Sequence, residues 1–337
     1  MVSFVIPTLN SGRTLEACLA SIRRQDFPAG GIEIVIADAG STDDTLAIAA
    51  RHGADRVVPN PLRTGEAGKA AGIAASRGDL IALVDSDNVL PAPDWLRQMT
   101  APFADPAIFG AEPIAYAWRP EDPALTRYFA LLGMNDPLCL WLGNYDRLSG
   151  ATGRWTDLPV HAEDAGGWLK LTLTAAALPT IGANGFVFRR ALLERVQWTP
   201  YFFDIDVVQQ AVAAGLQHVA KVKTGIVHLY CDAIGLFAAK QRRRIRDFLH
   251  FSQARQRTYP WRRQNRLAVA RFVLYTALVV PLLVQMAAGM RRRPDRAWWY
   301  HVPACWITLW VYGTAALGRA LGVKPRAQDR GGWQEAR

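Results

Sequence analysis

An apolar run that stops at two aspartates constrains this chain most. Ile81–Val84 has the composition of a buried β-strand, and Asp85 and Asp87 follow it with one small residue between them. A strand of this kind belongs inside a sheet, so its end holds two carboxylates at the edge of that sheet. Carboxylate oxygens are ligands that hard divalent cations prefer. The run therefore predicts an α/β fold with a cation site beside a strand end.

Strand and helix patterns alternate through the N-terminal part of the chain. The predicted strands are Val2–Ile6, Ile32–Ala37, Arg56–Val58 and Ile81–Val84, and the predicted helices are Thr14–Gln25 and Thr45–His52, the second capped by Ser41, Thr42 or Asp43. This alternation predicts a mainly parallel sheet covered by helices on both faces. Ligands of such sheets bind at the carboxyl ends of the strands. Polar residues follow three of those ends: Thr8 with Asn10, Asp38, and Asp85 with Asp87.

These segments resemble the family 2 glycosyltransferases of the GT-A fold. The resemblance is carried by Val5–Asn10, Asp38–Thr45, Gly68–Ala74, Gly78–Ile81 and Val84–Asp87, which occur in the family's order and at its spacing. It extends over residues 1–230. It implies a Rossmann-like GT-A catalytic domain that transfers a sugar, with inversion, from a nucleotide-diphosphate donor. It also implies a divalent metal cofactor, Mg²⁺ or Mn²⁺.

The resemblance assigns the donor and metal residues as well. The implied nucleotide-sugar-binding residues are Pro7, Thr8, Asn10, Asp38, Lys69, Asp85 and Ser86, and the implied metal ligands are Asp87 and His228. Lys69 would offer positive charge to the diphosphate, with a solvated lysine on a helix face as an equal alternative. His228 ends an apolar strand, which favours a ligand, although a single histidine is often structural.

The segment Tyr201–Val208 is predicted to supply the general base. Inverting transfer is a direct displacement, so the acceptor hydroxyl loses a proton as it attacks, and a nearby carboxylate accepts it. The resemblance places Asp204 on the family's base and Phe203 where the preceding acid usually stands. Asp206 is the second candidate. The alternative is that Asp204 caps a helix running to Ala214.

Two segments are predicted to meet the acceptor. Pro179–Arg190 resembles the family's acceptor-side segment and contributes Asn184 and Gly185, with a tight turn before a strand as the alternative. Leu236–Leu249 carries an apolar stripe beside a basic face, a pattern typical of a helix in the membrane interface. Its predicted lipid-phosphate ligands are Gln241, Arg242, Arg243 and Arg244, because guanidinium groups bind phosphate through paired N–H groups. Ile245 replaces the tryptophan that processive relatives carry beside such residues, so we expect single-sugar transfer.

Basic and apolar residues gather in the C-terminal part. The chain carries a net charge of +10, and residues 221–337 hold 22 of its 39 basic and 5 of its 29 acidic residues, a net +17. Phe272–Met290 and Trp298–Gly318 contain no lysine, arginine or carboxylate and are long enough to cross a ~30 Å hydrocarbon layer. We therefore predict two membrane helices and an anionic membrane surface as partner, rather than nucleic acid. A pair of buried core helices is the alternative.

The predicted organisation is a GT-A domain over residues 1–230, a basic amphipathic juxtamembrane region over 231–266, two membrane segments within 267–320 and a basic polar tail over 321–337. No cleavable signal peptide precedes the first strand, so the catalytic domain is expected in the cytoplasm, at the inner membrane. The four scattered cysteines agree with reduced thiols.

A polyprenyl phosphate or a polyprenyl-diphosphate-linked saccharide is the expected acceptor. The alternatives are another lipid, such as a diacylglycerol, or a membrane-anchored protein that binds a sugar nucleotide without turnover. His161, Glu163 and Asp164 resemble a second metal cluster, but we expect a solvated loop there.

Overall fold

The computed structural model describes residues 1–253, 257–259 and 266–323 and divides into two compact units. Unit 1 comprises residues 1–117 and 158–229, and unit 2 comprises residues 118–157 and the chain from residue 230 onward. Unit 1 thus ends beside the predicted domain boundary. Residues 118–157, however, group with the C-terminal helices. Most of the predicted basic tail lies outside the described residues.

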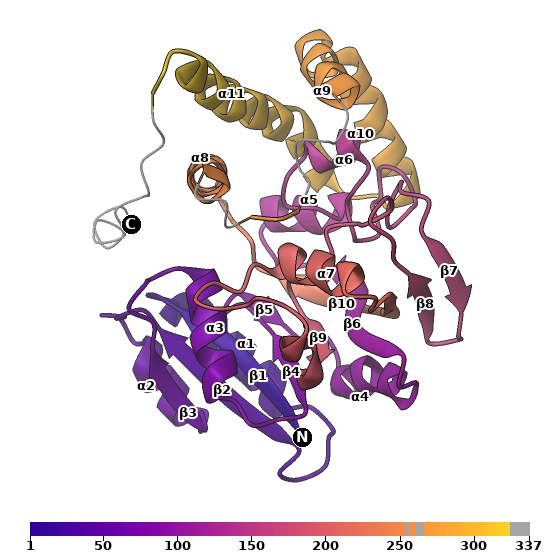
Figure 1. Ribbon diagram of the computed structural model, residues 1–337. Helices are drawn as coiled ribbons and strands as arrows, with labels where there is room; N and C mark the ends of the chain where they lie inside the picture. Colours follow the sequence, from indigo (N-terminus) through magenta and orange to yellow (C-terminus); the bar gives the residue numbers. More distant parts are fainter. Residues whose placement is uncertain (254–256, 260–265, 324–337) are drawn as a thin grey trace. The chain divides into compact units, whose positions relative to one another are not determined.

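Unit 1 is built around one sheet of ten strands (Figure 1). Its strands are β1 (Val2–Thr8), β2 (Ile32–Asp38), β3 (Arg56–Pro59), β4 (Leu80–Leu83), β5 (Asn88–Val89), β6 (Ile108–Ala117), β7 (His161–Asp164), β8 (Trp168–Thr172), β9 (Phe186–Arg189) and β10 (His218–His228). Its helices are α1 (Gly12–Arg23), α2 (Thr45–Arg51), α3 (Gly65–Ala75), α4 (Trp95–Thr100) and α7 (Asp204–Ala213), with 3₁₀ turns at Ala101–Ala104 and Arg190–Glu194. The strands and helices predicted for the N-terminal part are present, with ends that differ by a residue or two.

The sheet is mixed, which corrects the prediction of a mainly parallel one. Its order is β3-β2-β1-β4-β9-β6-β10-β8-β7, with β5 paired to β10. β3, β2, β1 and β4 are mutually parallel, whereas β9 is antiparallel to both β4 and β6. β6 and β10 are parallel, and β5, β7 and β8 add antiparallel pairs. The apolar pattern of a buried strand does not report its direction, so the sequence could not distinguish the two arrangements.

The parallel half of the sheet gathers the predicted strand ends. Thr8 is the register partner of Asp38 at the ends of β1 and β2, and Val5 pairs with Leu83 of β4. β1 and β2 are joined through α1, and β3 and β4 through α3, in opposite directions across the sheet. Because such crossovers are right-handed, the two helices cover opposite faces. The strand ends therefore lie between two faces that are each covered by a helix.

Small residues let α3 lie close to the sheet, where it packs on β1, β2 and β3. A Cβ atom added at Gly72 would lie 2.5 Å from Cγ1 of Val5, and one at Gly68 would lie 2.7 Å from Cβ of Pro7. Both contacts are shorter than packed carbon atoms tolerate. This close approach brings Lys69, which lies between the two glycines, to the strand ends.

Unit 2 is helical around a core of aromatic side chains. Its helices are α5 (Ala124–Leu132), α6 (Cys139–Leu142), α8 (Ile234–Gln253), α9 (Arg266–Leu278), α10 (Val280–Arg292), a 3₁₀ turn at Arg296–Tyr300 and α11 (His301–Ala320). Trp298 is fully buried in this core, and Tyr128, Phe129 and Phe237 pack in the same cluster. The predicted amphipathic helix is present as α8. The core is thus assembled from α5, α8 and the segment before α11.

The first predicted membrane segment is broken. Val279 lies between α9 and α10 with φ +61°, Pro281 stands in the first turn of α10, and the two helices meet at 92°. Among the described residues, no single helix is both long and apolar enough to cross a membrane, although the bent pair α9–α10 qualifies by length and composition. The second predicted segment corresponds to α11, whose buried side carries His301, Ala304, Cys305, Thr308 and Val311.

The close packing of α3 predicts opposite effects for two glycines of the same helix. Gly72→Ala should lower the free energy of unfolding by about 1–3 kcal/mol, because the added methyl group overlaps Val5. Gly65→Ala is the matched control, because no atom lies within 4 Å of its added Cβ, and it should leave stability unchanged or slightly raised. Urea unfolding measures both, and equal effects would contradict this packing.

Candidate active site

The predicted base lies in a largely buried ion pair. Asp204 is the first residue of α7, and its Oδ2 accepts a hydrogen bond from Nζ of Lys69 on α3 at 2.6 Å. Phe203 takes the cap position, so the alternative in which Asp204 caps the helix is not observed. Nζ of Lys69 also lies 3.9 Å from Oδ1 of Asp85. One ammonium group therefore joins the base segment to the aspartate after β4.

Burial sets the protonation of this pair. Removal from water raises the pKa of Asp204 to about 6, although the Lys69 ammonium acts in the opposite direction. Burial would lower the pKa of Lys69, but the carboxylates of Asp204 and Asp85 outweigh it and hold that pKa above its ordinary value. Lys69 is thus a permanent cation at neutral pH. Asp204 is mostly ionised there, with a proton affinity suited to general base catalysis.

The second carboxylate oxygen of Asp204 is available for chemistry. Its Oδ1 is buried and has no hydrogen-bond partner among the residues that the structure describes. A buried acceptor left in this state is costly unless a ligand satisfies it. Asp206 is also buried, at 2% exposure, in the same helical turn. Because Asp204 has this unbonded oxygen and pairs with Lys69 beside Asp85, we regard it as the better placed of the two predicted bases.

The two predicted metal ligands lie side by side. Nε2 of His228 at the end of β10 is 3.3 Å from Oδ1 of Asp87. Backbone pairing brings them together, because His228 is the register partner of Asn88 and the amide of Leu229 donates to the carbonyl of Asp87 at 2.8 Å. Within the described part of the chain, no cluster of three or more His, Cys, Asp or Glu side chains forms a complete metal site.

This pair fits a divalent cation that is completed by a ligand. Two donors that each lie about 2.1 Å from one cation, at right angles, are about 3 Å apart. The distance between Asp87 and His228 is close to that value. One carboxylate and one imidazole leave the remaining positions to phosphate oxygens and water, and Mn²⁺ accepts such a mixed set more readily than Mg²⁺.

Asp38 is occupied by contacts inside unit 1. Its carboxylate accepts hydrogen bonds from Oγ1 of Thr8 at 2.8 Å, from Oγ of Ser41 at 2.6 Å, and from the amides of Gly40 and Ser41. These bonds fix the turn after β2 against the end of β1. The structure therefore gives Asp38 a structural role, and its predicted contact with the nucleotide stays a prediction.

The other residues predicted to bind the nucleotide sugar surround the same strand ends. Oδ1 of Asn10, which has φ +49°, accepts from the amide of Thr42 at 2.9 Å. Oγ of Ser86 donates to Oγ of Ser11 at 3.0 Å, and Pro7 packs against α3 beside Gly68. The ends of β1, β2 and β4 thus form one continuous polar rim, as the sequence predicts.

The predicted acceptor segment is tightly packed. A Cβ added at Gly182 would lie 2.7 Å from the carbonyl oxygen of Asp204, and one at Gly185 would lie 2.8 Å from Cδ1 of Ile226. Both glycines have positive φ, and Asn184 between them is 7% exposed. In this structure the glycines allow close internal packing, as the turn alternative expects, and their contact with an acceptor stays a prediction.

The four predicted phosphate ligands of α8 differ in their surroundings. Nε2 of Gln241, which is fully buried, donates to Oγ1 of Thr308 at 3.1 Å. Nη1 of Arg244 donates to the carbonyl oxygen of Asn135 at 3.0 Å and to Oε1 of Gln241 at 2.8 Å. Arg242 is exposed and Arg243 is half-buried. Gln241 and Arg244 therefore contribute to the packing of unit 2, and Arg242 is the best placed for an external phosphate.

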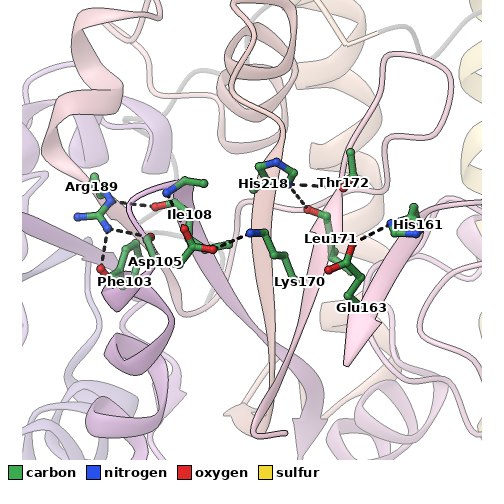
Figure 2. Close-up of polar contacts among 11 residues, drawn as sticks. Phe103, Asp105, Ile108, His161, Glu163, Lys170, Leu171, Thr172, Arg189 and His218 are labelled. Carbon is green, nitrogen blue, oxygen red and sulfur yellow. Dashed lines mark hydrogen bonds and ion pairs between the residues drawn. The ribbon is translucent and has the colours of Figure 1, made fainter. Parts of the chain in front are cut away.

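The residues that resemble a second metal cluster, His161, Glu163 and Asp164, lie on an exposed strand and not in the expected loop. His161 and Glu163 lie on the exposed strand β7, with Nδ1 and Oε1 3.8 Å apart (Figure 2). Asp164, on the same strand, pairs with Lys223. Lys170 on β8 pairs with Asp105, which lies between the 3₁₀ turn Ala101–Ala104 and β6, at 2.6 Å (Figure 2). These side chains are paired on the surface, so nothing gathers them around a cation.

Sequence reasoning missed several buried polar partners. The pairing of Lys69 with Asp204 joins residues 135 positions apart. Glu112 and Lys221, both fully buried, form an ion pair, and Oε1 of Glu112 accepts from the amide of Gly182 at 2.9 Å. An unusual charge inside an apolar strand was the available signal for Glu112 and Lys221. Nothing in the sequence indicated which residues they would pair with.

Comparison with known proteins agrees with this geometry. Residues 3–132 match the sequence model described as Glycosyl transferase family 2. An uncharacterized glycosyltransferase of Mycobacterium tuberculosis is 41% identical over 93 residues, which is 28% of this chain and 39% of the relative. An N-acetylglucosaminyltransferase of Rhizobium leguminosarum bv. viciae is 35% identical over 132 residues, 37% of this chain and 31% of the relative. The chain thus spans only about a third to two fifths of these relatives.

A solved structure resembles most of the chain. The mannosyltransferase PcManGT from Pyrobaculum calidifontis, in complex with GDP-Man and Mn²⁺, has a TM-score of 0.51 and 20% identity, and the match covers 92% of this chain and 87% of that one. The fold is therefore a mixed α/β fold of the GT-A type, with its polar site at the strand ends. Over residues 3–132 the chain is similar to Glycosyl transferase family 2.

The ion pair predicts a pH-dependent loss of stability on substitution of Lys69. Lys69→Met leaves a buried carboxylate without its cation, which should cost about 3–5 kcal/mol of unfolding free energy at pH 8. Losing the ammonium raises the pKa of Asp204 further above its unfolded value, so folding then favours the protonated acid. The deficit should therefore shrink as the pH falls to 5. Urea unfolding of variant and wild type at both pH values measures it.

The double variant Lys69→Met/Asp204→Asn is the control for this prediction. It removes the buried charge together with its partner, so its deficit relative to wild type should be smaller and nearly independent of pH. If Lys69→Met loses the same unfolding free energy at pH 5 and at pH 8, the Lys69 ammonium does not lower the pKa of Asp204 in the folded protein.

Proposed function

We propose that this chain is an inverting glycosyltransferase that moves one sugar from a nucleotide-diphosphate donor to a membrane lipid acceptor. The observation that carries the proposal is the largely buried carboxylate of Asp204, held by Lys69 beside Asp85 at the strand ends. A base, a permanent cation and a pair of metal-ligating side chains all belong to unit 1 and border the polar rim. These are the groups that displacement of a nucleotide diphosphate by an alcohol requires.

Asp204 acts as the base in this proposal. Its Oδ1 takes the proton from the acceptor hydroxyl as the hydroxyl oxygen attacks the anomeric carbon of the sugar. The bond from that carbon to the diphosphate breaks at the same time, and its electron pair leaves with the diphosphate. Attack from the face opposite the leaving group inverts the anomeric centre. Lys69 keeps the carboxylate ionised and oriented.

The leaving group needs positive charge. A divalent cation, when bound, would neutralise the diphosphate, and Asp87 with His228 are the residues that would hold it. Lys69 lies near enough to Asp85 to add a second positive charge on the same side. The complex of PcManGT with GDP-Man and Mn²⁺ supports a sugar nucleotide and a divalent metal as ligands of this fold.

The surface of unit 2 supports a lipid acceptor. Large apolar side chains at least 40% exposed cover α9, α10 and α11: Leu267, Val269, Val273, Leu274, Leu278, Val280, Leu283, Val284, Trp306, Trp310 and Leu317. Exposed apolar surface of this extent marks an interaction site. Arg266, Arg271, Arg291 and Arg292 are exposed on the same helices and favour anionic headgroups. These features support association with an anionic membrane, and we propose that the chain acts at the cytoplasmic face of the inner membrane.

The bent helix pair α9–α10 suggests how unit 2 would enter the membrane. α9 and α10 have 13 residues each, or about 20 Å of helix, which is shorter than the ~30 Å hydrocarbon layer. Exposed arginines stand at the outer end of each helix, and the uncharged bend at Val279 lies between them. We propose that the bend enters one leaflet while both charged ends stay at the same surface, in place of the predicted crossing.

The acceptor proposed is a polyprenyl phosphate or a saccharide linked to polyprenyl diphosphate. The exposed guanidinium of Arg242 on α8 supports a phosphate-bearing lipid over a neutral diacylglycerol, because it can form paired hydrogen bonds with phosphate oxygens. The basic character of the C-terminal part would also concentrate such lipids.

Sugar transfer should depend on Asp204 and not on Asp206, the other aspartate in the first turn of α7. In a panel of UDP-, GDP- and dTDP-sugars with Mn²⁺ or Mg²⁺ and a bacterial lipid extract, detergent-purified wild type should release nucleotide only when lipid is present. Asp204→Asn should reduce release at least about 100-fold, the lower range for loss of a general base. Asp206→Asn, in the same helical turn, is the matched control and should retain most of the activity.

Other outcomes of that assay are equally informative. Loss of release in Asp206→Asn but not in Asp204→Asn would move the base to Asp206. Metal-dependent binding of a sugar nucleotide without release, equal in wild type and variants, would favour a binding protein without turnover. Absence of binding for every sugar nucleotide would remove the proposed function.

Membrane association should depend on the exposed apolar residues of unit 2. Wild type should float with vesicles that contain phosphatidylglycerol, and less with neutral vesicles, because arginines near an anionic surface add about 1 kcal/mol each. The double variant Leu274→Glu/Val284→Glu should remain in the soluble fraction. Val57→Glu is the control, since Val57 is similarly exposed but lies in unit 1. Flotation of the double variant at the wild-type level would contradict the proposed surface.

A further inference from the structure

A chain of buried amide side chains runs behind the two candidate metal ligands. Asn88 closes the turn that holds Asp87. Its side-chain Oδ1 accepts a hydrogen bond from the backbone amide of Asp85 at 3.0 Å, and its backbone amide donates to the carbonyl oxygen of Asp85 at 2.9 Å. Nδ2 of Asn88 then donates to Oδ1 of Asn184 at 3.1 Å. Asn88 is fully buried, so this bond is shielded from competition with water.

The same chain continues to the second ligand. Nδ2 of Asn184 donates to the hydroxyl of Tyr116 on β6 at 3.2 Å. The ring of Tyr116 then packs on the imidazole of His228, with the ring centroids 5.7 Å apart and the planes inclined at 43°. Side-chain contacts therefore connect the turn of Asp87 to the ring of His228 through Asn184. All of these residues belong to unit 1.

We infer that Asn184 and Tyr116 are positioning residues that set the geometry of the Asp87–His228 pair for a divalent cation. The inference rests on the proposed function, because that function assigns the cation to this pair. It gives Asn184 a role different from the acceptor contact predicted from the sequence. Neither side chain is a metal ligand, and each acts through the residue it contacts.

The local backbone explains why asparagine occupies this position. Asn184 has φ +49°, a left-handed conformation that asparagine tolerates better than most residues. Its side chain supplies an acceptor to Asn88 and a donor to Tyr116, which a single planar amide can do at once. An aspartate would lack the donor, and a leucine would lack both groups.

Support of this kind has a measurable effect on metal binding. Side chains that orient metal ligands without touching the metal typically contribute about 10–100-fold in affinity. An unsupported Asp87 or imidazole ring would sample orientations that do not bind. The network should therefore influence affinity for the cation even where the overall fold is unaffected.

The test is the affinity of purified full-length protein for Mn²⁺ in the presence of UDP, measured by the electron paramagnetic resonance signal of free Mn²⁺. Asn184→Gly removes the amide without backbone strain, because glycine accepts φ +49°. Tyr116→Phe removes only the hydroxyl and keeps the ring on His228. We expect the dissociation constant to rise about 10–100-fold in Asn184→Gly and by a smaller factor in Tyr116→Phe.

Ser3→Ala is the matched control. Ser3 is fully buried near the start of β1, at the far end of the strand from the site, and its hydroxyl bonds to Glu33 and to the amide of Gly78. It should lower the melting temperature and leave the Mn²⁺ dissociation constant unchanged. Wild-type affinity in both network variants, with melting temperatures lowered as in Ser3→Ala, would overturn the inference and leave the proposed function intact. Absence of Mn²⁺ binding by wild type would remove the metal pair itself, and the inference with it.

Discussion

The contact between Lys69 and Asp204 is the constraint on which the candidate site depends. It joins α3, which follows β3, to α7, which follows the irregular segment after β9. A buried carboxylate and a buried ammonium are each unfavourable alone, so each fixes the position of the other. The glycines of α3 matter for the same reason, since they allow the helix to carry Lys69 down to the strand ends. The close packing of α3 on the sheet therefore also determines the surroundings of the Asp204 carboxylate.

Much of unit 1 could be predicted from local sequence patterns. The first strands and helices follow from apolar periodicity, and the gathering of Thr8, Asp38 and Asp85 follows from parallel pairing of β1, β2 and β4. The direction of β9 could not be predicted in this way, because a buried strand has the same composition in either direction. Its reversal between β4 and β6 turned a predicted parallel sheet into a mixed one.

The partners of buried polar residues were beyond local patterns. The sequence singled out Asp204, Asp87 and His228 through a family resemblance, but it offered no means of finding Lys69 opposite Asp204. Asn184 is a second residue whose hydrogen-bond partners could not be found from the sequence. The resemblance of its segment to a family segment predicted a contact with the acceptor, which stays a prediction, but it did not indicate that the Asn184 amide bonds to Asn88 and Tyr116 inside unit 1. Long-range hydrogen bonds depend on tertiary geometry, which residue spacing does not encode.

The path of the chain between the two units has a consequence for how this protein is made and divided. Residues 118–157 leave unit 1 after β6 and return before β7, yet their core partners Phe237 and Trp298 are synthesised much later. Until those partners emerge from the ribosome, α5 presents buried-type side chains such as Tyr128 and Phe129 to solvent and to chaperones. A fragment that stops at residue 229 would retain this exposed helix. Isolation of unit 1 therefore requires replacement of residues 118–157 by a linker, because a cut at a single position does not separate the two cores.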